Sequence, residues 1–472
     1  MIRMIEKYVK RLFWVPLVLG IIGYCAVGGK PFFEGIYASG ALYFVNPVDD
    51  MSNAWILAAE LLALVVTTGF LLTILGNVWS RFKYFVYNRF SDSVCVYSDN
   101  PYGEKLADSM KHSYLCSDIE GKKEFDSRDH IFLYTDELKS LRYVEEHQAG
   151  LRGKRVFIGL RNTDPSLLRS TKDQDVHYFN VLELTARLYW RTYSLYREVA
   201  EEGKEISVAI LDMNDVGEAV FRYGFMNNIF SLTQKITYHL WNCSPAQTAF
   251  LSELRTENGD RIVLHEEDWR VCPEALSDMD RVIVTEKNPL RDTGALLYVN
   301  RNMAVHFYSE TRLALAGILE APHLKEFGNL EEILTDENIR REMLYRQAKL
   351  FNFDYVLRAG NRTCPFSFEG EMESAWRELD GFRKCSNIAR ADHYWIEVLL
   401  EKAGTDEEDL QKMEHLRWCR FHTVNHWKYA EERDNSRRRH PLLVPYDELP
   451  GKEKEKDGIY DETIRQEIER LL

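Results

Sequence analysis

Residues 206–241 read ISVAILDMNDVGEAVFRYGFMNNIFSLTQKITYHLW. A short apolar run at Ile206–Leu211 is followed by a turn, a helix-like stretch at Gly217–Asn227 and a second apolar run at Lys235–Trp241. Short β-rich runs that alternate with helical stretches are typical of βαβ units, whose strands lie parallel in one sheet. The stretch therefore predicts a doubly wound α/β domain.

The same alternation continues on both sides of this stretch. Strands are expected at Ser93–Ser98, Ser113–Ser117, His130–Thr135, Arg155–Leu160, Arg261–His265 and Arg281–Thr285, with a longer helix at Val181–Ala200. We predict two tandem Rossmann-like domains at 91–200 and 201–330, followed by a mainly helical domain at 331–472.

Composition excludes several classes of protein. The chain has 472 residues, of which 45% are apolar and 28% charged, so it is neither disordered nor fibrous. Its formal charge of -14 argues against a partner made of nucleic acid, because a phosphate backbone requires a basic face. Eight cysteines without a CxxC pair suit a reduced, intracellular protein.

The apolar residues are concentrated in the first eighty positions. Residues 12–33 carry one charge, Lys30, and residues 54–80 carry only Glu60. Each run is long enough to cross about 30 Å of hydrocarbon as a helix. We therefore predict a membrane-anchored α/β protein, in which residues 1–90 form two transmembrane helices joined by a short outer segment.

Basic residues set the expected orientation. They flank both spans on the same side, at Arg3, Lys7, Lys10, Arg11, Arg81, Lys83 and Arg89, whereas the connecting segment is acidic. The positive-inside rule then places both termini in the cytoplasm. The prediction is a two-pass protein of the cell inner membrane.

Three acidic residues are candidates for a role at the membrane. Glu60 lies within the second apolar run, and Asp49 and Asp50 could form a cation-attracting outer ring. Because two helices cannot enclose a pathway, conduction would need a homo-oligomer. The alternatives are a structural pairing of Glu60 across an oligomer interface and a solvated loop at Asp49 and Asp50.

The segment between the two apolar runs could also enter the membrane. Residues 36–44 could form a re-entrant or interfacial helix. No TVGYG-like potassium filter is present in the sequence.

The turns that follow the first strand of each α/β domain are weak candidates for dinucleotide binding. In the first turn, Ser98, Asn100 and Gly103 occupy the phosphate-binding position, and Asp118 stands where a ribose-binding acid would be. In the second, only Gly217 remains, and Asp212 would repel a diphosphate. The alternative is that both glycines merely allow close packing of helix on strand. Without a catalytic constellation, we do not expect an enzyme.

This region resembles the TrkA-N (RCK-type) domains that regulate ion channels and transporters. The resemblance runs over roughly residues 92–310, through VCVYS, SYLCSD, HIFLY, RVFIG and the stretch quoted first. It implies ligand-controlled assemblies that act on membrane helices, and the family's usual ligand is a nicotinamide or adenine nucleotide.

Aromatic and basic residues gather near the end of the chain. The candidates for ligand binding are Trp418, Trp427, Tyr429, Arg433, His440, Pro441 and Tyr446. Aromatic faces stack on a base and guanidinium groups bind phosphate, so this set suits a nucleotide. The alternative is a small tryptophan core with solvated arginines. Although His415, Cys419 and His422 share one helix face, nothing completes a metal site, so no metal is expected.

Residues 370–465 resemble the RyR domain, the repeat named for ryanodine receptor channels. The matching segments are EHLRWCRFH, then WKY at Trp427–Tyr429, and HPLLVPYDEL at His440–Leu449, although Ala430 stands where glycine usually follows. The resemblance implies a small helical module that recognises adenine-type nucleotides. In bacteria such modules accompany membrane or nucleotide-signalling proteins, including predicted defence systems.

These features lead to three hypotheses of function. The first is a ligand-gated membrane protein, an oligomeric ion channel or membrane-disrupting effector in antiviral defence. An adenine nucleotide or NAD-derived second messenger from a separate enzyme would control it. The second is a membrane-tethered, TrkA-like regulator of cation (potassium) transport, and the third is an NAD-binding membrane-anchored enzyme.

Overall fold

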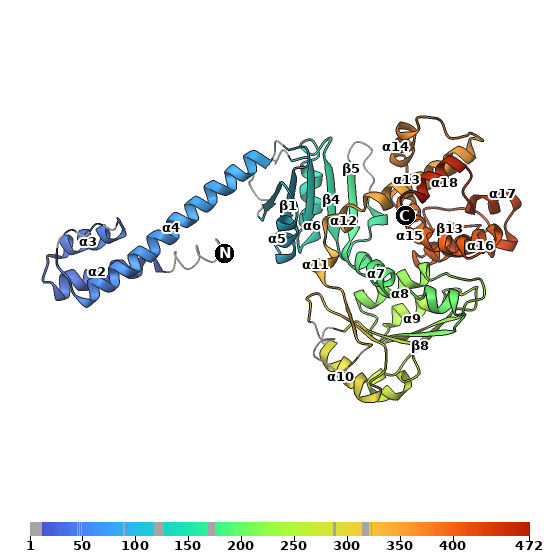
Figure 1. Cartoon of the computed structure of the whole chain (residues 1–472), viewed down its shortest axis with the longest axis horizontal. Coiled ribbons are helices and arrows are strands. Elements are labelled where there is room, and N and C mark those ends of the chain that lie inside the picture. The colour runs from blue at the N-terminus through green and yellow to red at the C-terminus, as the bar shows by residue number, and fades with distance from the viewer. Residues whose placement is uncertain are drawn as a thin grey trace. The chain divides into compact units, whose positions relative to one another are not determined.

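The computed structural model describes residues 12–44, 46, 48, 50–87, 90–117, 127–168, 175–286, 289–313, 321 and 323–472. The chain divides into two compact units, one up to Ser93 and one from Val94 to Leu472 (Figure 1). Two candidate site residues, Asp49 and Asp118, lie outside the described residues, as do the basic residues Arg3, Lys7, Lys10, Arg11 and Arg89.

The regular elements that the structure describes in the first unit are all helical. It contains α2 (Trp14–Ile21), a π-helical turn η1 (Ile22–Val27), α3 (Phe32–Ala41), a 3-10 turn η2 (Leu42–Phe44) and the long α4 (Ala54–Tyr87). Small residues bring these helices close together: a Cβ at Gly20 would lie 2.7 Å from the Ser39 Oγ, and one at Gly23 would lie 2.6 Å from Ile56. The outer segment, expected at 36–44 as a short helix, is helical as far as Phe44.

The two predicted spans are not both confirmed. The first apolar helix, Trp14–Val27, measures about 21 Å at 1.5 Å per residue, short of the roughly 30 Å of a hydrocarbon core. Gly29, with a φ of +73°, and Pro31 end it before residue 33. Among the described residues, one helix is long and apolar enough to cross a membrane, Ala54–Gly76, by length and composition alone. Of the acidic candidates, Glu60 lies on this helix and is half-buried. Asp50 precedes the helix and is exposed.

The second unit begins with a five-stranded parallel sheet, sheet A. Its strands are β1 (Val94–Ser98), β2 (Ser113–Cys116), β3 (Asp129–Leu133), β4 (Arg155–Leu160) and β5 (Asp175–Asn180), in the order β2-β1-β3-β4-β5. The helices α5 (Pro101–Ser109) and α6 (Glu137–Glu146) connect the strands. The first four strands were predicted. The edge strand β5 was not, because Phe179 alone of its residues is buried and polar residues stand at both of its ends.

A six-stranded parallel sheet, sheet B, follows. Its strands are β6 (Ile206–Ile210), β7 (Ile236–Trp241), β8 (Arg261–His265), β9 (Arg281–Val284), β10 (Val305–Tyr308) and β11 (Lys325–Phe327). Their order is β11-β10-β9-β6-β7-β8, with helices α8 (Asp215–Asn227), α9 (Pro245–Leu251) and α10 (Pro289–Val299). Both sheets are doubly wound and Rossmann-like, but they are not copies of one another. Numbered along the chain, sheet A runs 2-1-3-4-5 and sheet B runs 3-2-1-4-5-6.

Helix α7 (Val181–Thr192) joins the two sheets. Val181 and Leu184 belong to the core beneath sheet A, whereas Ala186, Tyr189 and Trp190 belong to the core of sheet B. The single helix expected at 181–200 is therefore divided: α7 ends at Thr192, and a π-helical turn η4 (Arg197–Glu201) follows.

The remainder is mainly helical, as predicted. After the short helices α11 (Leu330–Ile333) and α12 (Asp336–Arg340) come α13 (Glu342–Ala359), α14 (Glu369–Arg377), α15 (Gly381–Lys402) and α16 (Glu407–Val424). A loop region then holds the two-residue strands β12 (Lys428–Tyr429) and β13 (Arg439–His440), the turns η8 (Tyr446–Glu448) and η9 (Glu455–Asp457), α17 (Gly451–Lys454) and α18 (Glu462–Glu469). Apolar residues of α15 and α16, including Ile396 and Leu416, join the core of sheet B.

Candidate ligand-binding site

Helix α16 carries the candidate Trp418, and its N-terminus is well capped. The Asp406 side chain accepts a hydrogen bond from the Asp409 N–H, and three acidic residues occupy the first turn, which complements the helix dipole. His415, Trp418, Cys419 and His422 follow at spacings of three and four, so they lie on one face of the helix. That face packs against the loop region from Trp427 to Tyr446.

The structure brings three of the predicted ligand-binding residues together. The ring centroids of Trp418 and His440 are 5.1 Å apart, and those of Trp427 and His440 are 6.1 Å apart. His422 lies between them, 4.0 Å from the Trp418 ring and 5.3 Å from the Trp427 ring. Trp427 and His440 are buried, whereas Trp418 is half-buried. The cluster is thus a small core whose outer member is Trp418.

The two histidines of this cluster are neutral at physiological pH. Burial, with a smaller contribution from neighbouring positive charges, lowers the pKa of His422 to about 3. Burial and the charge of Arg433 lower the pKa of His440 to about 4. The uncharged rings can therefore stack on one another and on an aromatic base.

The other four candidates lie around this cluster at different depths. Arg433 is exposed, and its Nε donates a hydrogen bond to the Asn435 Oδ1 at 2.9 Å. Tyr429 is 51% exposed and Pro441 is half-buried. Tyr446 is buried and turned toward Gln411, whose Oε1 accepts its hydroxyl hydrogen bond at 2.9 Å. The geometry thus places Tyr446 with His415 rather than with Trp427.

His415 is the charged member of this face. Although burial opposes the charge, the Asp457 carboxylate, 3.3 Å from Nδ1, helps to raise the pKa of His415 to about 11. Its Nε2 lies 2.9 Å from the Val444 carbonyl oxygen, so both ring nitrogens can donate. This imidazolium ties α16 to the loop that closes the domain.

A family comparison identifies this region. Residues 398–472 match the RyR domain. Comparison with curated proteins and with solved structures found no match. The RyR domain thus includes the end of α15, all of α16 and the loop region with its aromatic cluster, which confirms the C-terminal resemblance.

The RyR domain is bonded to sheet B through buried charges. The Arg420 guanidinium donates to the Phe225 carbonyl at 2.9 Å, to the Asn258 side chain at 2.8 Å and to the Asp260 carboxylate at 2.9 Å. Arg222 of α8 donates to the Val424 carbonyl at 3.1 Å, at the end of α16. Trp418 and Arg420 are two residues apart, so the aromatic face and the sheet-bound face belong to one rigid helix.

Helix α15 makes a second connection just before the RyR domain. The Asp392 carboxylate accepts hydrogen bonds from the Arg187 Nε at 2.6 Å and from the Tyr223 hydroxyl. Arg187 lies on α7 and Tyr223 on α8, and all three side chains are buried. The pKa of Arg187 is raised because the neighbouring Asp392 charge outweighs the effect of burial.

The candidate phosphate turns are occupied by asparagine side chains. Asn100 accepts the Gly103 N–H at 3.1 Å and donates to the Leu133 carbonyl at 2.8 Å, across the point where the strand order of sheet A reverses. Asn214 does the same in sheet B, accepting the Gly217 N–H at 3.0 Å and donating to the Thr285 carbonyl at 2.7 Å. These N–H groups are those that a phosphate at the helix N-terminus would use.

The glycines in these turns allow close packing of helix on strand. A Cβ at Gly103 would lie 2.1 Å from the Ser98 side chain, and one at Gly217 would lie 2.0 Å from the Asp212 carbonyl oxygen. In sheet B the pKa of Asp212 is raised by burial and by the neighbouring Glu286 carboxylate. The geometry of both turns therefore indicates that Gly103 and Gly217 serve close packing of helix on strand rather than the binding of a dinucleotide.

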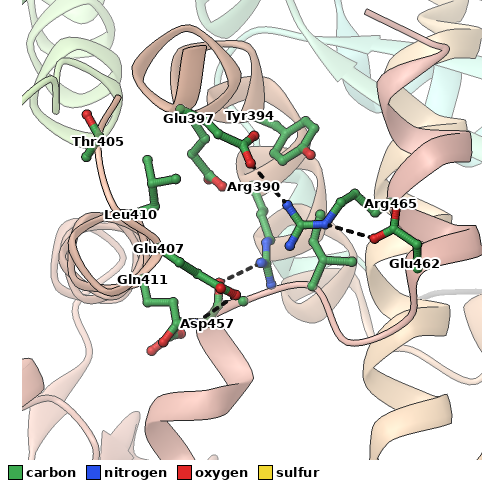
Figure 2. Close-up of a pocket in the computed structure, with 13 residues that line it drawn as sticks. Arg390, Tyr394, Glu397, Thr405, Glu407, Leu410, Gln411, Asp457, Glu462 and Arg465 are labelled. Carbon is green, nitrogen blue, oxygen red and sulfur yellow. Dashed lines mark hydrogen bonds and ion pairs between the residues drawn. The ribbon is translucent and has the colours of Figure 1, made fainter. Parts of the chain in front are cut away.

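A cavity of about 330 Å³ lies beside the N-terminal half of α16 (Figure 2). Side chains from α15, α16, η9 and α18 line it, among them Tyr394, Glu397, Gln411, Asp457 and Arg465. None of these was a sequence candidate. The sequence holds one signal that could have pointed to this cavity. One face of α16 repeats at intervals of three and four residues, through Glu407, Leu410, Gln411 and Glu414. On a charged helix, however, the same pattern also describes a solvated surface.

Proposed function

We propose that this protein is a ligand-gated membrane protein whose RyR domain senses a nucleotide-type ligand in the cytoplasm. Binding shifts the Rossmann-like pair and, through it, the apolar N-terminal helices. The output is ion conductance or loss of membrane integrity, which suits an effector of antiviral defence that a separate enzyme activates with a second messenger. The chain acts as a homo-oligomer, since its few apolar helices cannot enclose a pathway alone.

The ligand surface proposed is the outer side of the aromatic cluster. Trp418 is half-buried and offers part of its ring to a base, with neutral His440 beside it at 5.1 Å between centroids. Arg433 is exposed and forms no ion pair among those the structure describes, so its guanidinium is available to a phosphate. An adenine nucleotide or an NAD-derived ligand has both groups.

One observation most strongly supports the step in which ligand binding to the RyR domain moves the second α/β domain. Trp418 and Arg420 stand on the same helix turn, and Arg420 is bonded to Phe225 of α8 and to Asn258 and Asp260, which precede β8 of sheet B. A ligand that moves α16 must therefore either move sheet B or break buried bonds. A ligand changes such an equilibrium only by its differential affinity for the two states.

The membrane assignment rests on the apolar character of the first unit. Helix α4 exposes large apolar side chains along its length, including Leu57, Leu61, Val65 and Phe70. Water would oppose such a surface, whereas lipid or a second copy of the helix would cover it. The chain then continues within seven residues from Tyr87 to β1, which couples the helices covalently to sheet A.

Electrical recording tests the proposal. The full chain is reconstituted into planar bilayers and exposed to a panel of adenine nucleotides, cyclic nucleotides and NAD derivatives. We expect one of these to raise conductance. Arg433→Ala should abolish the response, whereas Arg470→Ala, which changes an exposed arginine just after α18, should retain it. Silence of the folded protein under every ligand would overturn the gating proposal.

A regulator of cation transport that forms no pore is the second candidate. The two parallel Rossmann-like sheets favour it, because their tandem arrangement resembles TrkA-type regulators. It predicts ligand binding without conductance of the isolated chain, and conductance only when a transport subunit is added. Calorimetry with the same nucleotide panel, beside the recordings, distinguishes the two.

A further inference from the structure

The cavity beside α16 has a strongly acidic lining. Five carboxylates face it, from Glu397, Glu401, Glu407, Asp457 and Glu462, against two guanidiniums, from Arg390 and Arg465. Its volume of about 330 Å³ falls at the small end of the range for pockets that hold organic ligands. A phosphate or carboxylate ligand would meet net repulsion there, whereas a cation would be attracted.

The two arginines of the cavity already have partners. Arg465 lies 3.7 Å from a Glu401 carboxylate oxygen and 3.8 Å from one of Glu462. Arg390 donates to the Asp457 carbonyl oxygen at 2.8 Å, and its Nε lies 3.7 Å from Glu414. Neither guanidinium makes a hydrogen bond to Glu397.

Three buried polar groups in the cavity wall lack hydrogen-bond partners. The Arg390 Nε is one of them, although it lies 3.7 Å from a Glu414 carboxylate oxygen. The other two are the Glu397 Oε1 and the Tyr394 hydroxyl, in residues that are 8% and 3% exposed. Figure 2 shows both side chains extending from α15 at the same end of the cavity. Buried polar groups are normally satisfied, so this pair indicates a group that the chain itself does not supply.

The nearest nitrogen to Glu397 does not satisfy its carboxylate. The His393 Nδ1 lies 3.5 Å from the Glu397 Oε1 and also lacks a hydrogen-bond partner. His393 Nε2 lies 3.2 Å from the Ile229 carbonyl oxygen and donates to it, which fixes the orientation of the ring. A hydrogen-bond donor placed at the Glu397 Oε1 would satisfy that oxygen.

We propose that this cavity binds a small organic cation whose ammonium or guanidinium group is held by Glu397 and Tyr394. The cationic group donates to the Glu397 carboxylate and to the Tyr394 hydroxyl oxygen, while the remaining carboxylates of the lining attract its positive charge. This site is distinct from the proposed nucleotide surface, which lies nearer the C-terminus of α16, although Asp457 of the cavity pairs with His415.

A bound metal ion is the alternative that the same residues raise. Ligand atoms of His393, Glu397 and Glu414 lie within 4.8 Å of one another. Both oxygens of Glu414, however, accept hydrogen bonds from Arg417, at 2.6 and 2.8 Å. A guanidinium in that position opposes a divalent cation, and the cavity is much larger than an ion, so we favour the organic cation.

Calorimetry and thermal unfolding of the full chain in detergent test the site. The probes are 1,4-diaminobutane and agmatine as cations, 1,4-butanediol as the neutral match, and zinc and magnesium chloride. We expect saturable heat and a raised Tm with a cation but not with the diol. Glu397→Gln should weaken binding about tenfold or more, and Tyr394→Phe by a smaller factor.

The controls separate this proposal from structural damage. Glu448→Gln changes an exposed carboxylate outside the cavity lining and should bind like the wild type. Tyr394→Phe keeps the buried ring, so it remains informative if Glu397→Gln folds poorly. Equal responses to diamine and diol, unchanged affinity in both variants, or binding of metal alone would each overturn the proposal. Nucleotide heat should persist in Glu397→Gln, so failure here is distinguishable from failure of the proposed function.

Discussion

Arg420 of the RyR domain and Asp260 of sheet B form a fully buried ion pair, with 2.9 Å between Nη2 and Oδ2 and side-chain exposures of 1% and 0%. Asp260 also accepts the Ile236 N–H at 2.8 Å and the Gln234 amide at 2.9 Å. A buried charge pair of this kind is costly to break, because the remaining partner stays uncompensated. The pair therefore fixes the position of α16 on the sheet.

Replacing this arginine tests that role. We expect Arg420→Ala to lower the free energy of unfolding by about 3–5 kcal/mol, since Asp260 is left buried and charged. Urea unfolding of the full chain in detergent measures it. Arg470→Ala, which removes an exposed pair with Glu467, should cost under about 1 kcal/mol. Equal losses in the two variants would contradict the assignment.

Asp392 provides a second test of the connection to the Rossmann-like pair. Asp392→Asn removes the charge that faces Arg187 and should destabilise the protein by about 3 kcal/mol or more. Hydrogen exchange should show faster opening of α7 and α8, which supply the partners of Asp392. Asp380→Asn, at the exposed N-terminus of α15, is the control and should leave those amides protected.

The pH dependence of stability should reveal His415. Its pKa is about 11 in the folded chain and about 6.5 when unfolded, so its stabilising effect is complete below pH 6.5 and is lost as the pH rises toward 11. Denaturant unfolding of the wild type and His415→Gln should differ most near pH 6 and converge at alkaline pH. A difference that is constant with pH would contradict the charged state.

The packing role of the turn glycines leads to another prediction. In Gly217→Ala the new Cβ would meet the Asp212 carbonyl oxygen, so α8 must shift, and we expect a loss of about 1–3 kcal/mol. Gly370→Ala is a matched control, because nothing lies within 4 Å of its Cβ position on α14. That change should be neutral or stabilising by about 0.5–1 kcal/mol. Thermal unfolding of both variants decides the point.

Most strands could be predicted because each has a run of buried β-branched or aromatic residues, as at Val94–Ser98 and Ile206–Ile210. Strand β5 could not, because an edge strand with half-buried polar residues lacks that signal. The span predicted over residues 12–33 is not confirmed: hydropathy averages over Gly28, Gly29 and Pro31, where the apolar helix Trp14–Val27 ends.

The site could be predicted in part. Trp418, Trp427 and His440 share one cluster, because the helix period and the following turn bring them together. Tyr446 faces Gln411 instead. The conformation of the loop decides this contact, and a loop conformation leaves no periodic pattern in the sequence from which it could be predicted. Tyr394 and Glu397 stand three residues apart on α15, and their lack of partners emerges only from the packing of four segments.

The different strand orders of sheets A and B have a consequence for the ancestry of the chain. Tandem duplication copies a segment together with its connections, so the descendants inherit one topology. An arrangement of 2-1-3-4-5 beside one of 3-2-1-4-5-6 requires either rewiring or the fusion of two unrelated genes. The two α/β domains should therefore be compared with other proteins one at a time, because treating them as repeats would assume a shared topology that they lack.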